Sequence, residues 1–507
     1  MNDASFIVNR FPEHIWIEPT TRCNTRCKYC LHWYESFGED MEFSLYEKIR
    51  DQILDHVKRV ELIGYGEPLI AKHFWDMFHD CSRRDIEILT TTNGLLLLDE
   101  EKLPLIVRSL FTICLSLDGA HKETAEFARP FIKWEKMIEI LELLKKYGDH
   151  AGVEKRFSLR FNFVAMKQNI GDLPDLVKLA AKYGASDIFV MTLGAELERN
   201  LVKGQGLFDS PELVSPAFLK ALKLGRRLGI DLNLPPSFRS LVLAGKEQKR
   251  GAKGKILYLL RMLDMGLLYL RNKGFHAAWN RSMQIIRPPD KAGITFCPVP
   301  WDSAYIAVDG TVYPCCVLSS KLGNLKSQDW SEIWNGFLYQ NLRRTIHGWN
   351  PTAGCRYCGL SCGINGGDEH YYNQYFSAYK KKDIPLNSLD IEFKQGFYEL
   401  EYKEDGAPSH IWMAKRGEFR IRKSPGARFL RLLIISLIPG GNVNSGKAIL
   451  NQGRDEYFDN TCEDINFPLY KIQGNWIDVA LEMEREFRVQ PDPRLLALPI
   501  KGVQFLS

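Results

Sequence analysis

The chain has 507 residues, of which 45% are hydrophobic and 25% charged, and a formal net charge of only +5. This length predicts two to four domains with ample core, and the small net charge excludes a protein that binds nucleic acid over its whole surface. The N-terminal residues lack a basic stretch followed by an apolar one, so no secretory signal is expected and a cytoplasmic location is predicted.

Cysteine usage points to metal binding. The chain contains twelve cysteines, and without a signal peptide these indicate a reducing compartment and metal sites in place of disulfides. Nine of the twelve fall in two clusters. The others, Cys81, Cys114 and Cys462, stand in apolar or unpatterned stretches and are expected to be core thiols.

The first cluster has the spacing C-x3-C-x2-C and consists of Cys23, Cys27 and Cys30. Three thiolates on one short loop can hold three corners of a four-iron cluster and leave the fourth iron without a protein ligand. The alternating, β-rich residues 14–18 precede the loop, which is therefore expected at the C-terminal end of a strand, where α/β barrels carry their active sites. Half of a zinc site, or unrelated buried thiols, is the alternative.

This motif, with the aromatic Tyr29 beside its last cysteine, resembles the radical SAM superfamily. The resemblance implies a catalytic 4Fe-4S cluster whose open iron binds the amino and carboxylate groups of S-adenosylmethionine. It also implies an incomplete (β/α)6 barrel with a lateral opening for larger substrates, and a flavodoxin- or ferredoxin-type reductant as partner.

Short β-rich runs alternate with helical stretches from about residue 12 to 230, as repeated strand-helix units require. We expect an α/β fold, with the partial barrel at residues 1–234. The expected parallel strands are residues 14–18, 60–63, 86–90, 112–116, 158–164 and 187–191.

A glycine-rich run follows the second strand and contains Gly64, Gly66, Glu67 and Pro68. It resembles the family's GGEP motif, with Tyr65 in place of one glycine. Glycine lets the backbone approach a ligand closely, and in the family this segment holds the amino group of the methionine moiety. An ordinary strand-to-loop turn is the alternative.

Polar side chains also follow the next strands. Asn93 after the third strand, and Ser116 and Asp118 after the fourth, resemble family segments that face the ribose, although Asn-Gly and Asp-Gly also favour turns. Arg160 and Asn162 share one face of the fifth strand by the period of two. Arg160 is a candidate for binding the methionine carboxylate or for a structural ion pair.

The second cluster surrounds a predicted hairpin. An Asp-Gly turn within the alternating residues 304–316 predicts the hairpin, which would bring Cys297 near Cys315. Cys355 and Cys358 follow as a CxxC pair, and zinc is the alternative occupant of such a site.

The second cluster and the residues around it resemble the SPASM and twitch extensions of radical SAM enzymes, which bind auxiliary iron-sulfur clusters. The cysteines are fewer than in a complete SPASM domain, so one auxiliary 4Fe-4S cluster is expected, in a domain at residues 293–375. The expected ligands are Cys297, Cys315, Cys355 and Cys358. Cys316 and Cys362 stay unassigned, and each is a candidate ligand, hydrogen-atom donor or buried thiol.

The strand-helix rhythm breaks at residues 235–292. A basic stretch precedes an apolar run at residues 256–270, which is too short to span a bilayer comfortably. An amphipathic helix covering the barrel opening is one interpretation, and peripheral membrane contact is the other.

The C-terminal part is predicted to be all-β. A polar linker at residues 380–387 leads to residues 390–507, where alternating runs separated by turn residues predict a β-sandwich of jelly-roll character. Its ending loosely resembles a module of enzymes that build cell-surface glycans, so a glycan-binding role is expected. The clearest strands are residues 397–402, 411–414, 419–422, 429–435 and 476–481.

These resemblances imply an enzyme that reductively cleaves S-adenosylmethionine to a 5′-deoxyadenosyl radical, which abstracts hydrogen from a substrate. A sugar, nucleotide-sugar or glycan component undergoing oxidation, epimerisation or dehydration is the favoured substrate. A peptide- or protein-modifying maturase is the alternative enzyme, and a non-catalytic iron-sulfur or glycan-binding protein is the alternative of another class.

Overall fold

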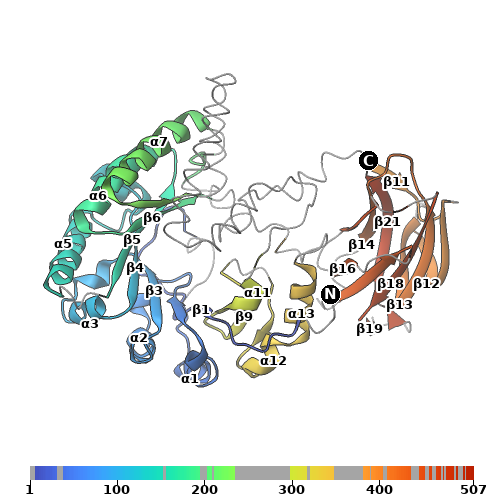
Figure 1. Cartoon of the computed structure of the whole chain (residues 1–507), viewed down its shortest axis with the longest axis horizontal. Helices are drawn as coiled ribbons and strands as arrows, with labels where there is room; N and C mark the ends of the chain where they lie inside the picture. The colour runs from blue at the N-terminus through green and yellow to red at the C-terminus, as the bar shows by residue number, and fades with distance from the viewer. Residues whose placement is uncertain are drawn as a thin grey trace.

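The chain forms three consecutive parts, coloured blue to green, yellow and orange to red in Figure 1. The computed structural model describes residues 6–30, 38–151, 156–193, 202–207, 210–234, 297, 299–316, 320–346, 355 and, with short gaps, 381–506. The predicted insertion at residues 235–292 lies outside these ranges, as do Cys358, Cys362 and Cys462.

The first part contains a parallel sheet in which consecutive strands are neighbours. All six predicted strands are confirmed, and a seventh short strand, β7, continues the sheet beyond β6. The strands are β1 (His14–Ile17), β2 (Arg59–Leu62), β3 (Glu87–Thr92), β4 (Phe111–Ser116), β5 (Ser158–Ala165), β6 (Asp187–Thr192) and β7 (Asp231–Asn233).

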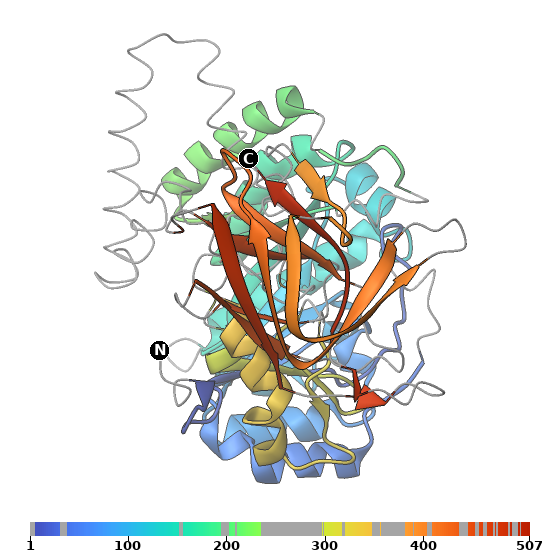
Figure 2. The ribbon, with the colours of Figure 1, turned by 90° about the vertical axis from the view of Figure 1, so that its right-hand side faces the viewer.

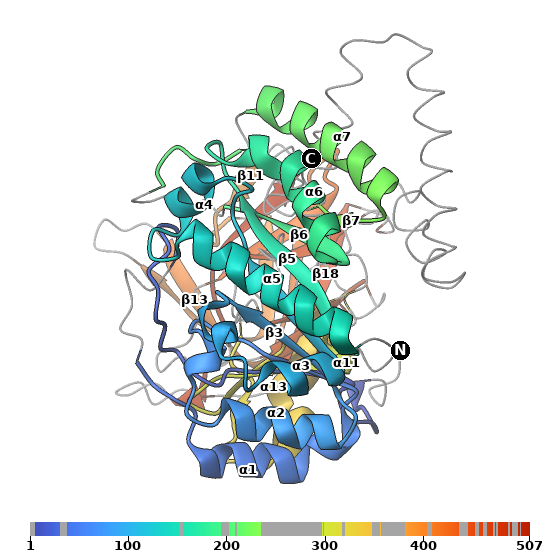
Figure 3. The same cartoon turned by 90° about the vertical axis from the view of Figure 1, so that its left-hand side faces the viewer.

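Helices pack against the outer face of this sheet, in front of the strands in Figure 3. The longest, α5, buries Met137, Ile140, Leu141 and Leu144, which recur at the helical spacing that makes one apolar stripe. The helices are α1 (Phe43–Gln52), α2 (Phe74–Arg83), α3 (Leu103–Arg108), α4 (Lys122–Ala128), α5 (Trp134–Ala151), α6 (Leu173–Tyr183) and α7 (Pro211–Leu228).

The second part extends the same sheet. Strand β8 pairs in parallel with β1 and antiparallel with β9, and the turn between β8 and β9 contains Gly310 at φ 83°. The predicted hairpin is therefore confirmed, and β8 joins it to β1, the strand that precedes the first cysteine cluster. The elements are α11 (Val299–Asp302), β8 (Ser303–Ile306), β9 (Thr311–Tyr313), β10 (Gly323–Asn324), α12 (Trp330–Trp334) and α13 (Phe337–Thr345).

The ten strands of this sheet run in the order β10-β9-β8-β1-β2-β3-β4-β5-β6-β7. Its outermost strands, β7 and β10, do not pair with each other within the described residues, so the barrel stays open along one side. The predicted partial barrel is confirmed.

The third part is all-β and antiparallel, as predicted, and surrounds its own apolar core (Figure 2). The long strand β13 pairs with β12 along one edge and with β18 and β21 along the other. The main strands are β11 (Lys381–Ile384), β12 (Ile391–Tyr402), β13 (Pro408–Arg422), β14 (Phe429–Ile434), β15 (Ser445–Leu450), β16 (Glu456–Asp459), β17 (Asp464–Pro468), β18 (Trp476–Met483) and β21 (Leu498–Leu506), with the short pair β19 (Phe487–Arg488) and β20 (Leu495–Leu496).

Two details of this part differ from the sequence prediction. The expected linker contributes β11, which pairs with β21, and the separate strands expected at 411–414 and 419–422 form the single strand β13. The jelly-roll character and the glycan-binding role stay predictions. No described helix has the length and apolarity that crossing a membrane requires.

Candidate active site

The first three cysteines lie on the loop that directly follows β1, at the carboxyl edge of the parallel sheet. Cys27 is buried, while Cys23 and Cys30 are partly exposed. A backbone hydrogen bond from the amide of Cys30 to the carbonyl of Cys27 (3.0 Å) folds this end of the loop into a turn. The loop thus presents three thiols within eight residues at the edge where a barrel carries its chemistry.

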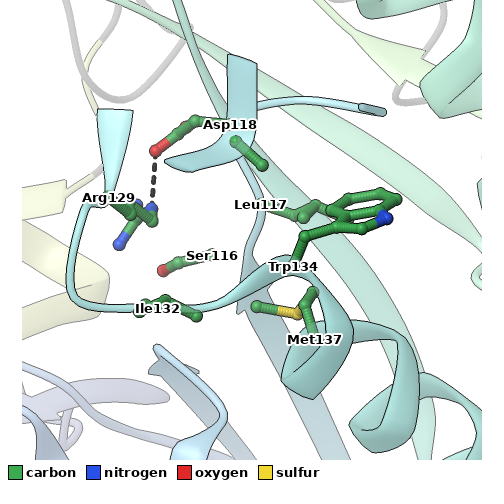
Figure 4. A pocket seen from close by; sticks show the side chains of 8 residues that line it. Ser116, Leu117, Asp118, Arg129, Ile132, Trp134 and Met137 are labelled. Carbon is green, nitrogen blue, oxygen red and sulfur yellow. Dashed lines mark hydrogen bonds and ion pairs between the residues drawn. The ribbon is translucent and has the colours of Figure 1, made fainter. Parts of the chain in front are cut away.

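A buried arginine joins this loop to the end of β4. Arg129 donates through Nη1 to the Cys27 sulfur (3.3 Å), through Nε to Asp118 (2.6 Å) and through Nη2 to the Tyr29 hydroxyl. Tyr29 in turn donates to Asp118 (2.5 Å). Figure 4 shows Arg129 and Asp118 beside Ser116 at a small pocket, which the apolar side chains of Leu117, Ile132, Trp134 and Met137 also line.

The charges of this network support a bound cluster. Burial alone lowers the pKa of Arg129, but Asp118, Cys27 and Tyr29 outweigh burial and raise this pKa well above its ordinary value. The guanidinium therefore stays positive. Burial raises the pKa of the Cys27 thiol, and Arg129 opposes that rise. A permanent positive charge beside Cys27 favours the thiolate form that iron requires.

The predicted site residue Asp118 is fully buried and already has several protein partners. Its second oxygen accepts the backbone amide of Val164 (2.7 Å), in addition to the donors from Arg129 and Tyr29. Asp118 thus fixes the cysteine loop against β4 and β5. Its predicted contact with the ribose stays a prediction.

Glu67 connects the glycine-rich run to the end of β3. Its carboxylate accepts the Thr92 hydroxyl (2.7 Å) and the backbone amides of Asn93 (2.8 Å) and Leu69 (3.3 Å). Burial raises the pKa of Glu67, against these three hydrogen bonds, which lower it. Asn93 also donates to Asn24 of the cysteine loop (2.7 Å). Glu67 and Asn93 therefore hold three consecutive parts of the site edge together.

We expect Glu67→Gln to weaken S-adenosylmethionine binding and to lower thermal stability. A glutamine amide nitrogen cannot accept, so one buried donor loses its partner at a cost of about 1–3 kcal/mol. Equilibrium cofactor binding and thermal denaturation measure the two effects. Glu139→Gln, on the exposed side of α5, is the matched control. Unchanged affinity for S-adenosylmethionine would show that Glu67 belongs to an ordinary turn and has no part in cofactor binding.

The glycines of the same run lie against the cysteine loop. A Cβ atom at Gly66 would stand 2.3 Å from the carbonyl oxygen of Arg22 and 2.5 Å from that of Thr20. A Cβ atom at Gly64 would stand 2.4 Å from the Glu18 side chain. Both glycines are thus required for close packing of the motif on the loop that carries the thiols.

Gly66→Ala should therefore displace the cysteine loop and lower the iron content of the reconstituted protein by about one four-iron cluster. The two contacts are to backbone atoms, which cannot rotate away as a side chain can. Gly171→Ala is the matched control, because nothing lies within 4 Å of a Cβ atom there. Iron analysis after anaerobic reconstitution compares the two variants, and equal iron in both would contradict this role of Gly66.

Ser116 and Asn162 face each other across β4 and β5, where they are partners in register. Asn162 donates to Thr91 (3.3 Å), but its buried Oδ1 atom has no hydrogen-bond partner among the described residues. An unsatisfied buried acceptor beside a serine at the carboxyl edge fits a polar ligand such as the cofactor.

Arg160 forms a structural ion pair, which was one of its two predicted roles. It forms an ion pair with Asp187 on β6, with nitrogen-oxygen distances of 2.5 and 3.4 Å. Cys114 lies next to this pair, and its burial raises the pKa of its thiol to about 12, so it is a core thiol, as is the fully buried Cys81.

Sequence reasoning did not identify Glu18, which connects the two cysteine-bearing parts. This buried carboxylate accepts the amides of Tyr65 (2.9 Å) and Val308 (3.1 Å) and a hydrogen bond from Tyr305 on β8. Burial raises its pKa. Glu18 could have been identified from the sequence, because it is an acidic residue at the end of the first strand. Arg129 was also missed, because it lies eleven residues beyond Asp118 with no motif around it.

Three of the four predicted ligands of the auxiliary cluster lie together, and the fourth, Cys358, is outside the described residues. Cys297 forms a small buried group with Val299 and Ile346, against which Cys315 and Cys355 pack. Cys316 is exposed, and its role as a hydrogen-atom donor stays a prediction.

No three Cys, His, Asp or Glu side chains converge as ligands of one ion anywhere in the described ranges. A four-iron cluster differs in this respect, because each thiolate binds a different iron.

Comparison with known families agrees with this geometry. Residues 17–180 match the family model of the radical SAM superfamily. Residues 297–359 match the model of SPASM, an iron-sulfur cluster-binding domain. The chain therefore contains a radical SAM domain and a SPASM domain. Its radical SAM and SPASM domains imply a catalytic 4Fe-4S cluster, an auxiliary iron-sulfur cluster and bound S-adenosylmethionine.

Two curated relatives each match about a third of the chain. The tungsten-containing aldehyde ferredoxin oxidoreductase cofactor-modifying protein of Pyrococcus furiosus is 29% identical over 185 residues, 36% of this chain and 51% of the relative. The mycofactocin maturase MftC of Mycolicibacterium smegmatis is 27% identical over 173 residues, 33% of this chain and 42% of the relative. The chain thus spans about half the length of these relatives.

Among solved structures, Streptococcus suis SuiB bound to precursor peptide SuiA aligns with a TM-score of 0.48 and 19% identity, over 73% of this chain and 74% of SuiB.

Proposed function

We propose that this protein is a radical SAM maturase, which cleaves S-adenosylmethionine reductively and removes a hydrogen atom from a peptide or protein substrate. The observation that carries the enzymatic part is the three-cysteine loop beside the buried Arg129 at the carboxyl edge of an open parallel sheet. When bound, the cluster supplies the electron that cleaves the cofactor to the 5′-deoxyadenosyl radical.

The chain's own residues bind and orient these groups. Cys23, Cys27 and Cys30 hold the cluster, and Arg129 balances the charge of the Cys27 thiolate. Ser116 and the unpaired Oδ1 atom of Asn162 offer polar contacts to S-adenosylmethionine between β4 and β5.

Two observations support a peptide or protein substrate. Both curated relatives are named for modification of another molecule, one as a maturase and one as a cofactor-modifying protein. The sheet is open along the side between β7 and β10 within the described residues, which suits a large substrate. Neither relative supports the sugar substrate that the sequence analysis favoured.

Deuterium transfer tests the substrate class. The reconstituted enzyme, S-adenosylmethionine and a reduced flavodoxin are incubated with extracts of the source cells grown on deuterated medium and separated into macromolecular and small-molecule fractions. Mass spectrometry should detect deuterated 5′-deoxyadenosine with the macromolecular fraction, and prior protease treatment should remove the signal.

The other outcomes are distinct. Deuterated 5′-deoxyadenosine formed only with the small-molecule fraction would support a sugar substrate and refute the maturase proposal. Complete absence of reductant-dependent 5′-deoxyadenosine, with and without extract, would indicate a non-catalytic iron-sulfur protein.

A further inference from the structure

One face of α13 is directed at the auxiliary cysteines. Ile346, which immediately follows the helix, packs in the buried group that contains Cys297 and receives Cys315. Arg343 and Tyr339 lie three and seven residues before Ile346, a spacing that places all three side chains on the same helical face. Both are almost completely buried.

The hydroxyl group of Tyr339 makes no hydrogen bond within the described structure. Its ring packs edge-on against Trp334 at 4.8 Å, a contact that phenylalanine would make equally well. Its hydroxyl is buried without a hydrogen-bond partner among the described residues. Burial raises the pKa of this hydroxyl, the nearby Arg343 lowers it, and the Cys315 thiol raises it further.

Arg343 also has a buried donor without an acceptor in the described part of the chain. Its Nε donates to the Pro300 carbonyl (2.8 Å), and its Nη1 donates to the Phe6 carbonyl (3.0 Å) and to Asn335 (3.1 Å). Its Nη2 is buried without a partner among the described residues. No carboxylate faces the guanidinium in these contacts, and burial lowers its pKa to about 10.

Buried donors in folded proteins nearly always have acceptors, so two orphan donors on one helical face indicate an acceptor that belongs there. A four-iron cluster with four thiolates is anionic, and its sulfur atoms accept hydrogen bonds. The missing acceptor and the missing countercharge of Arg343 would both be supplied by such a cluster.

We propose that the Tyr339 hydroxyl and the Arg343 guanidinium donate hydrogen bonds to the sulfur atoms of the auxiliary cluster and thereby raise its reduction potential. Donors stabilise the reduced cluster more than the oxidised one, because the reduced cluster carries one more negative charge. Both are positioning and tuning residues. The proposal rests on the auxiliary cluster of the SPASM domain and is independent of the substrate.

The test uses the full chain in which Cys23, Cys27 and Cys30 are replaced by alanine, so that only the auxiliary cluster remains. Its midpoint potential is measured by a redox titration followed by electron paramagnetic resonance. Tyr339→Phe should shift the potential to a more negative value while iron content stays at about four per chain. Arg343→Lys, which keeps the charge but loses the planar fork, should shift it in the same direction.

Tyr183→Phe, a buried tyrosine at the end of α6 in the barrel, is the matched control and should leave the potential unchanged. Unchanged potentials in both Tyr339→Phe and Arg343→Lys, with iron bound, would overturn the proposal. If Tyr339→Phe does not fold, Arg343→Lys decides alone. Absence of iron in the triple-alanine background itself would refute the auxiliary cluster, which is a separate result from an unchanged potential.

Discussion

Replacing Cys23, Cys27 and Cys30 together with alanine should abolish reductive cleavage of S-adenosylmethionine and leave the auxiliary cluster in place. The reason is spatial separation: the three cysteines follow β1, whereas Cys297 and its neighbours form a different buried group beside α13. Iron content after anaerobic reconstitution should fall from about eight to about four per chain, the difference of one four-iron cluster.

Liquid chromatography of 5′-deoxyadenosine measures cleavage, and iron and sulfide analysis measures the clusters. Cys81→Ala removes a buried thiol from the barrel core and should leave both clusters and cleavage intact, so it controls for the loss of any cysteine. Cleavage at the wild-type rate in the triple variant would refute the catalytic cluster. Zinc in place of the four remaining irons would refute the auxiliary one.

Much of the fold follows from local patterns. The strands of the barrel were predictable because buried parallel strands are short, β-rich and separated by helical stretches, and the Asp-Gly turn marked the β8–β9 hairpin. The pairing of β8 with β1 was not predictable, since nothing in either segment specifies a partner nearly 290 residues away.

The errors in the C-terminal part have physical causes. Two separate strands were predicted at residues 411–414 and 419–422, but Gly417 between them lies inside β13, where a Cβ atom would stand 2.6 Å from Met413. The glycine is thus a site of close packing. Strand β11 was missed because its residues are mostly charged and exposed, and only its pairing with β21 makes it a strand.

In the site, too, the residues of local motifs were predictable, whereas their distant contact partners were not. The cysteines and glycines were identifiable because their chemistry requires a fixed local spacing. Their partners were not, since Arg129 contacts Cys27 across 102 positions of the chain and Glu18 contacts Val308 across 290. The glycine-rich segment that contains Glu67 was expected to hold the amino group of the cofactor, and the three hydrogen bonds of Glu67 give it a role in holding the edge of the sheet.

The ion pair between Asp118 and Arg129 should be among the most important contacts for stability of the barrel edge. The Asp118 side chain is fully buried and that of Arg129 is only 12% exposed. Removing one partner of such a pair leaves an uncompensated buried charge, which costs about 3–5 kcal/mol. Both Asp118→Asn and Arg129→Met should therefore increase hydrogen exchange of residues 111–128 more than a hundredfold, at roughly 1.4 kcal/mol per tenfold change.

The double variant distinguishes a charge effect from a simple loss of packing. With both charges removed, no buried ion lacks a partner, so exchange should be much slower than the product of the two single effects predicts. The exposed pair Lys136–Glu139, with side chains about half accessible, is the matched control, and its removal should change exchange little because solvent screens it. Strictly additive effects would show that Asp118 and Arg129 act separately, and Arg129 would then hold Cys27 without help from β4. Coupled effects would instead mean that the loop carrying the catalytic cluster is fixed to the sheet through one shared charge pair.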